Sequence, residues 1–165
     1  MSDPRTNSGA KFYIGVDSTT NLAKPQATDL DATGFAALTW LEVKAVGSVG
    51  ETGTQTNIVS YDTLGTDVTL KGKGISNGGD PEIEVARIPT DPGQIQMRAA
   101  AATRNSYAFK YEQDDAITPT TGTGTTFYNR GLITGPRHPN GRNEDFVLEI
   151  YQLGLNQKEV VVEPT

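Results

Sequence analysis

The sequence predicts a mainly β fold, a β-sandwich or barrel with one flanking α-helix. Short runs in which apolar and polar residues alternate recur along the chain, separated by turns rich in Gly, Asn, Asp and Pro. Only one segment, at about residues 92–104, carries the signals of a helix. The composition agrees, because 35% of the residues are hydrophobic while 18 are Gly and 9 are Pro. A chain of 165 residues is long enough for one domain with a core of its own.

Strands are expected on both sides of this helix. The first, residues 11–16, alternates so that Phe12, Ile14 and Val16 share the inner face. The others are expected at residues 38–46, 57–61, 66–73, 82–85, 107–112, 126–133, 145–153 and 158–162. We divide the chain into an N-terminal arm (1–10), a sandwich domain (11–153) and a C-terminal arm or strand (154–165).

The helix has a complete N-terminal signal. Asp91 is a good N-cap, Pro92 suits the first helical position, and Gln94 stands third, where a capping box has Glu or Gln. Further along, a stripe of residues at i, i+4 and i+7 falls on one face. We expect this stripe to pack against the sheet; it consists of Ile95, Ala99 and Ala102.

Charge and composition exclude several classes of protein. The chain has 14 Lys and Arg against 20 Asp and Glu, a formal net charge of −6, whereas domains that grip nucleic acid are normally basic. Without Cys it can form neither a disulfide nor a thiolate metal site. There is no apolar signal core and no apolar run long enough to cross a membrane, so we expect a soluble protein without membrane contact.

Residues that could carry catalysis are few. His138 is the one histidine and lies in an expected turn, where a solvated side chain is the simpler interpretation. The acidic pairs Glu82/Glu84 and Asp114/Asp115 match no metal-binding or nucleophile motif. The residues alone therefore predict no enzyme, no cofactor and no metal site, and favour a structural or binding module.

Read in order, the chain resembles a tail tube protein, or major tail protein, of long-tailed (siphovirus-type) bacteriophages. The resemblance covers most of residues 11–160 and rests on the order and spacing of several segments. These are Ala37–Val43, Gly50–Gly53 leading into Asn57–Val59, Thr69–Gly72, the Asp91–Gln94 helix entry with the Tyr107–Tyr111 strand, Gly131–Ile133 and Phe146–Leu148.

The resemblance implies a structural subunit that forms hexameric rings, stacked into the tube through which genome DNA is ejected into the host. The implied partners are further copies of the chain, a tape measure protein inside, and terminator or tip proteins at the ends. DNA would pass an acidic bore without specific binding. The protein would be made in the host cytoplasm and reside in the virion tail.

The resemblance also implies positions for the contacts. An extended loop or hairpin at about residues 45–66 would reach neighbouring subunits, and both terminal arms would bridge rings. The candidate inter-subunit residues are Gly50, Glu51, Thr52, Gly53, Asn57, Ile58 and Tyr61. The candidate residues facing the lumen are Asp67, Thr69, Lys71, Lys73, Glu42 and Lys44.

Two alternatives remain open from the sequence. The first shares the fold and is the inner tube protein of a contractile tail or of a type VI-like system. The second is a virion decoration or adhesin β-sandwich, which would be a binding module that does not polymerise.

Overall fold

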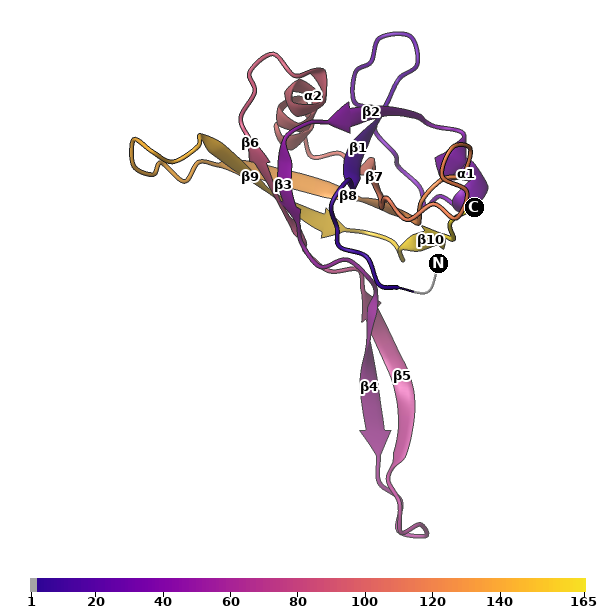
Figure 1. Cartoon of the computed structure of the whole chain (residues 1–165). Helices are drawn as coiled ribbons and strands as arrows, with labels where there is room; N and C mark the ends of the chain where they lie inside the picture. The colour runs from indigo at the N-terminus through magenta and orange to yellow at the C-terminus, as the bar shows by residue number, and fades with distance from the viewer. Residues whose placement is uncertain (1–2) are drawn as a thin grey trace.

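The computed structural model describes residues 3–165, which form ten strands and two helices (Figure 1). In chain order these are β1 Lys11–Val16, α1 Ala32–Ala36, β2 Thr39–Val43, β3 Val46–Val49, β4 Gln55–Tyr61, β5 Leu70–Asn77, β6 Glu82–Ala86, α2 Pro92–Ala101, β7 Tyr107–Glu112, β8 Thr126–Arg137, β9 Leu148–Leu155 and β10 Val160–Val162. The mainly β fold expected from the sequence is confirmed.

Eight strands form one antiparallel sheet that folds over on itself. Its order is β2-β1-β7-β8-β9-β6-β3, and β10 also pairs with β8. The first half of β8 pairs with β7 and its second half with β9, so this strand belongs to both layers. The first layer is β2-β1-β7 with the first half of β8 and β10, and the second layer is β3-β6-β9 with the second half of β8. Opposite β8, β2 pairs with β1 while β3 pairs with β6, and the chain bends between them at Ala45, whose φ is 59°. Strands that pass from one layer to the other make the corners of such a sandwich.

The main core lies between the two layers. Phe12, Ile14 and Val16 of β1 are buried there, as expected. They meet side chains from the other layer, of which Ile83 and Tyr151 are fully inaccessible to solvent. Helix α2 contributes Met97 and Ala100 to the same core and contacts β1, β2 and β8. The alternation in the strands therefore places one apolar face of each layer inside.

A second, smaller core covers the outer face of the first layer. Phe35 of α1 stacks on Tyr128 with ring centroids 5.1 Å apart, and the Trp40 Nε1–H donates to the Phe35 carbonyl over 3.2 Å. The Asp31 carboxylate caps α1 by accepting from the Gly34 N–H over 2.7 Å. The sequence predicts only the helix near residues 92–104 and misses α1, because a five-residue helix is too short to show a period.

Helix α2 begins as predicted but presents a different face to the core. The Asp91 carboxylate accepts from the Gln94 N–H over 3.0 Å, which confirms the N-cap, and the helix ends at Ala101 instead of Arg104. The predicted stripe of Ile95, Ala99 and Ala102 is exposed, so that prediction is wrong. The buried residues are Gly93, Gln94, Met97 and Ala100.

Two residues at the start of α2 determine this orientation. A Cβ at Gly93 would overlap the carbonyl of Glu42, so glycine allows the helix to lie directly on β2. The buried Gln94 amide donates to the carbonyls of Lys44 over 2.8 Å and Ala86 over 2.9 Å, and accepts from the Ile88 N–H over 2.8 Å. Gln94 thus joins the helix to both layers and forms no capping box with Asp91.

Candidate functional site

The most prominent feature of the molecule is a hairpin, β4–β5, that projects from the body (Figure 1). It continues the pair β3–β6 outward, since the Gly50 N–H donates to the Glu82 carbonyl over 2.7 Å where the two strands leave the body. The expected reaching segment was residues 45–66. The structure places the hairpin at residues 55–77, because β3 belongs to the body and the predicted strand at 66–73 is displaced to residues 70–77.

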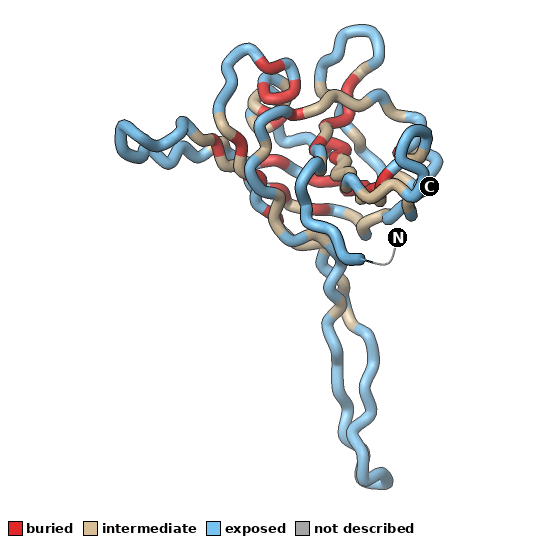
Figure 2. Tube along the Cα trace, in the orientation of Figure 1, coloured by how far each residue is buried: buried red, intermediate tan, exposed pale blue. Residues whose placement is uncertain are grey.

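The hairpin exposes a row of apolar side chains on one face. Val59 lies opposite Gly72, and Tyr61 lies opposite Leu70, so these residues share a side. Val59, Tyr61 and Leu70 are 54%, 72% and 53% exposed, and no residue of either strand is buried (Figure 2). An isolated two-stranded hairpin has marginal stability in water. Clustered exposed apolar groups of this kind mark interaction sites.

Beside the hairpin, the second layer presents an uncovered polar face. The inner side chains of β6 and β9 are buried, while Glu82, Glu84, Ile150 and Gln152 point outward. Thr134 continues the row of Glu82 and Gln152 on β8. This polar face, formed by β3, β6, β9 and the second half of β8, differs from the outer face of the first layer, which α1 covers together with Leu30 and Leu38.

The layer that carries the polar face has two unpaired margins. Among residues 3–165, β3 pairs on one side only, with β6, and residues 132–137 of β8 pair on one side only, with β9. Unpaired N–H and C=O groups at a strand edge can pair with a strand of another chain.

The candidate lumen residues do not lie on one surface. Lys71 and Lys73 are on β5, on the hairpin side opposite Val59 and Leu70. Asp67 and Thr69 belong to the strand predicted at residues 66–73, but the structure places them in the connection at the far end of the hairpin. Glu42 is on β2 and Lys44 directly follows it, both in the other layer. The six residues therefore fall into three places, and that they face a lumen stays a prediction.

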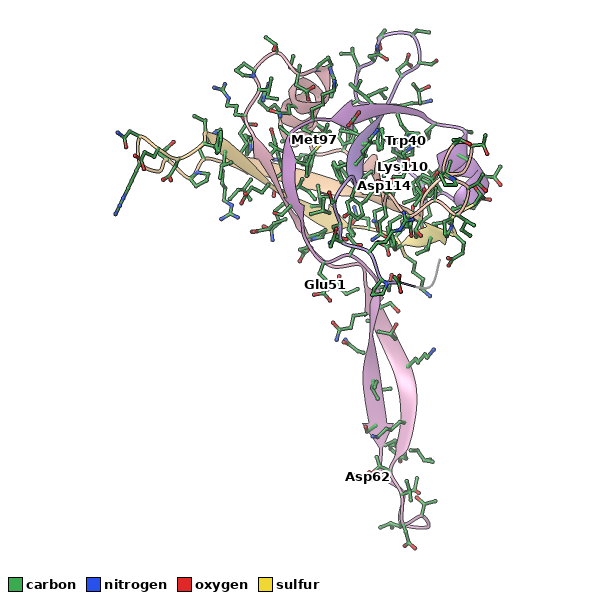
Figure 3. All side chains as sticks on the ribbon, viewed as in Figure 1. Trp40, Glu51, Asp62, Met97, Lys110 and Asp114 are labelled. Atoms are coloured by element: carbon green, nitrogen blue, oxygen red, sulfur yellow. The ribbon has the colours of Figure 1, made fainter. Side chains whose placement is uncertain are left out.

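The candidate inter-subunit residues lie on one strand of the hairpin and on the segment that joins it to the body. Gly50, Glu51, Thr52 and Gly53 connect β3 with β4, and Glu51 marks the base of the hairpin while Asp62 marks its far part (Figure 3). The other three, Asn57, Ile58 and Tyr61, are exposed on β4. Whether they contact another subunit remains a proposal.

Both terminal segments lie against the body of their own chain. Of the expected N-terminal arm, residues 1–2 lie outside the described residues, and Arg5 donates to the Asp114 carbonyl over 2.8 Å. In the expected C-terminal arm, β10 pairs with β8, and the Thr165 carbonyl oxygen accepts from the N–H groups of Ile117 and Thr118 over 2.9 and 3.0 Å.

A buried ionic cluster holds α2 to the second layer. Glu149, fully buried, accepts from Arg87 Nε over 2.9 Å, from Arg98 Nη1 over 3.3 Å and from the Tyr151 hydroxyl over 2.5 Å. Burial raises the pKa of Glu149, but the Tyr151 hydrogen bond and the Arg98 charge outweigh it and hold that pKa below its usual value. Sequence reasoning missed this cluster, because the only local sign is a Glu at an inward position of an apolar strand.

A second group that the sequence did not reveal lies on the outer face of the first layer. Lys110 Nζ is 4.2 Å from the centroid of the Tyr13 ring and 5.5 Å from that of Trp40, and it forms an ion pair with Glu112 over 3.6 Å (Figure 3). Burial lowers the pKa of Lys110. The cation is thus already partnered, and its role is to hold β1, β2 and β7 together.

The residues considered for catalysis are separate from one another. Asp115 accepts from the Thr125 N–H over 2.5 Å and from its hydroxyl over 2.6 Å, so it fixes a loop. Glu82 pairs with Arg137, and His138 follows β8 in the connection to β9. Within residues 3–165 no three His, Asp or Glu side chains are grouped as metal ligands would be. Neither helix described there has the length and apolarity to cross a membrane.

No protein-family model matches the chain, and no curated protein matches it in sequence. Solved structures do match its fold. A chain of the SPP1 tail tube superposes with a TM-score of 0.65 at 13% identity, covering 97% of this chain and 80% of the other. A chain of the PVC sheath–tube complex of an extracellular contractile injection system, in the extended state, has a TM-score of 0.68 at 9% identity, covering 99% and 94%.

A chain of the sheath/tube terminator structure of the same kind of injection system also has a TM-score of 0.68, at 10% identity, covering 98% of this chain and 99% of the other. These matches extend over nearly the whole chain, hairpin included, so the likeness is one of complete architecture. The chain therefore has the fold found in the SPP1 tail tube and in tube-bearing contractile injection systems, and the resemblance suggested by its sequence is confirmed at the level of the fold.

Proposed function

We propose that this chain is the structural subunit of a bacteriophage tail tube. Its copies form hexameric rings that stack into a hollow conduit for genome DNA, and the tube is part of the virion tail. The observation that carries this proposal is the β4–β5 hairpin, which presents Val59, Tyr61 and Leu70 to solvent beyond the reach of the chain's own core. A second copy of the chain would supply the missing cover.

The two unpaired margins of the layer that carries the polar face support ring closure. β3 of one copy and residues 132–137 of β8 of the next can pair edge to edge, which continues the sheet from subunit to subunit. A heterologous contact of this kind closes into a ring when the rotation between copies divides a full turn. Contacts made by the hairpin between rings do not close, and they therefore extend the assembly into a tube.

The fold comparisons support a tube over the decoration or adhesin alternative, because each compared structure is named as a tube or as a part of an assembly that contains one. The same comparisons give a second candidate function, the inner tube of a contractile tail or injection system. A gene for a sheath protein beside the coding sequence would favour this second candidate.

The proposed partners follow from the same assembly. Other copies of this chain are the main partner, a tape measure protein occupies the bore before ejection, and terminator or tip proteins bind the tube ends. The acidic chain, with a net charge of −6, lets DNA pass without specific binding.

Electron microscopy of the purified full chain tests the proposal directly. Long tubes with a central hole are expected. In a matched comparison, Val59→Ser, Tyr61→Ser and Leu70→Ser are combined in one variant, and Leu22→Ser and Ile117→Ser, two exposed apolar residues of the body, in another. The hairpin variant should stay a folded monomer with an unchanged Tm, while the body variant should form tubes. Monodisperse wild-type monomers at high concentration would contradict the proposal.

A further inference from the structure

The polar face of the second layer has an unusual distribution of charge. Two rows run across its strands: Glu82, Gln152 and Thr134 form one, and Ser48, Glu84, Ile150 and Arg137 form the other. Asp80 adds a third acidic side chain next to Gly154. Among the outward-facing residues of these described strands, Arg137 is the one cation.

Arg137 is held by an acidic neighbour in the adjacent row. Its Nη2 lies 2.6 Å from Glu82 Oε1, and both side chains are more than half exposed. An exposed pair of this kind contributes little to the stability of the fold. Its effect is on the surface instead, because the carboxylate accepts from one nitrogen of the guanidinium and offsets the positive charge that would otherwise attract a phosphate group.

The position of this face gives the pair a function. No other segment within residues 3–165 covers this face. The outermost strands of its layer form the two unpaired margins, and β3 and β6 lead into the projecting hairpin (Figure 1). Joining copies at those margins would make the sheet continuous, with one of its two faces around the bore. The opposite face of this layer is the buried core, so only the polar face can line a water-filled channel.

We propose that the face of β3, β6, β9 and the second half of β8 lines the bore, and that Glu82 keeps Arg137 from binding the passing DNA. This inference rests on the proposed function and adds to it the residues of the wall. Without Glu82, every subunit of every ring would present a free guanidinium to a polyanion. Because phosphate contacts add along a strand, such repeated cations would hold the DNA that the tube has to release.

The test uses assembled tubes of the full chain and a short single-stranded DNA oligonucleotide carrying a fluorophore. Three variants are compared with the wild type: Glu82→Gln, Glu84→Gln and the double change Glu82→Gln with Arg137→Gln. Binding is measured by co-sedimentation with the tubes at low and at high salt. Lys71 and Lys73 are present in all of them and contribute the same background.

Glu82→Gln should bind the oligonucleotide about tenfold more tightly than the wild type at low salt, with the gain lost as salt rises. Glu84→Gln removes the same charge from the same face but leaves Arg137 held, so it should remain near the wild type, as should the double variant. Equal binding by Glu82→Gln and Glu84→Gln would overturn the role of Glu82, as would failure of Glu82→Gln to assemble.

A second experiment determines whether the Glu82–Arg137 pair lies inside or outside the tube. The oligonucleotide is attached to beads wider than the tube, which cannot enter the bore. Glu82→Gln tubes should not capture these beads, and capture would overturn the assignment of this face to the bore. If the wild-type protein forms no tubes at all, the proposed function fails. If it forms tubes, the binding results test only whether the polar face lines the bore and whether Glu82 keeps Arg137 from binding DNA.

Discussion

The body and the hairpin of this molecule are built from the same kind of sequence and reach opposite states. β5 and β6 are consecutive strands, and each carries two aliphatic side chains among polar, glycine or alanine residues. In β6, Ile83 and Val85 are fully buried beneath α2 and the first layer; in β5, Leu70 and Ile75 stand in solvent (Figure 2). Aliphatic residues in a strand thus predict an apolar surface, but they carry no information about what covers that surface.

The energetic consequence differs accordingly. Burying a side chain such as Ile or Val stabilises a fold by roughly 1.5–3 kcal/mol, so the body gains from each inward residue. The hairpin gains nothing comparable within a single chain. Its apolar residues contribute only where another molecule covers them, and this separates residues that govern folding from residues that govern assembly.

The largest effect is expected from a charge in the core of the body. Ala100→Glu places a carboxylate between α2 and the sheet without a partner, and the free energy of unfolding should fall by roughly 4 kcal/mol. Ala99→Glu is the matched control, because Ala99 is the neighbouring position on the exposed face of the same helix. It should change the stability by less than about 0.5 kcal/mol in urea denaturation. Similar losses in both variants would show that the helix is oriented differently.

The next prediction compares the two regions with one type of change. Ile83→Ala in β6 should lower the free energy of unfolding of the monomer by about 2–5 kcal/mol, since it leaves a cavity. Leu70→Ala in β5 should lower it by less than about 0.5 kcal/mol. Denaturant titration of both variants measures the difference. A loss of more than 2 kcal/mol for Leu70→Ala would mean that the hairpin is already covered in the monomer.

A smaller effect concerns the buried Glu149. Because its pKa is lower in the folded chain, its contribution to stability is present above the pKa of the unfolded chain, about 4.3, and is lost as the pH falls through the lower folded value. Glu149→Gln should cost about 1–3 kcal/mol at neutral pH and reduce the acid-induced loss of stability. Unfolding measured from pH 7 to pH 2 gives both quantities. An unchanged pH profile in the variant would assign the acid sensitivity to other carboxylates.

The smallest effect is expected for the hairpin alone. Tyr61→Ser should leave the free energy of unfolding of the monomer within about 0.5 kcal/mol of the wild type. Amide hydrogens of β4 should exchange faster than those of β6 in the monomer, because local opening of the hairpin exposes no core. Assembly should slow the exchange in β4. Equal protection of the two strands in the monomer would remove the distinction between the regions.

Local chemistry made part of this structure predictable. The alternation identified eight of the ten strands in place or nearly so, and the Asp91–Pro92 signal placed the start of α2 correctly. The inter-subunit candidates fell on one strand of the hairpin and the segment before it, while the lumen candidates fell into three separate places. The cause is that sequence spacing defines which residues share a face within one element, whereas a surface is assembled from several elements.

The sequence by itself determined the periodicity of each strand, the cap of the helix, the acidic charge and the absence of cysteine. Only the tertiary structure decided which face of α2 is buried, because a period defines a spacing but not a phase, and the contacts of Gly93 and Gln94 with distant strands set that phase. It also decided where the chain bends at Ala45 and which acid meets Arg137. Those pairings join residues far apart in the chain, and their geometry exists only once the two layers have closed on each other.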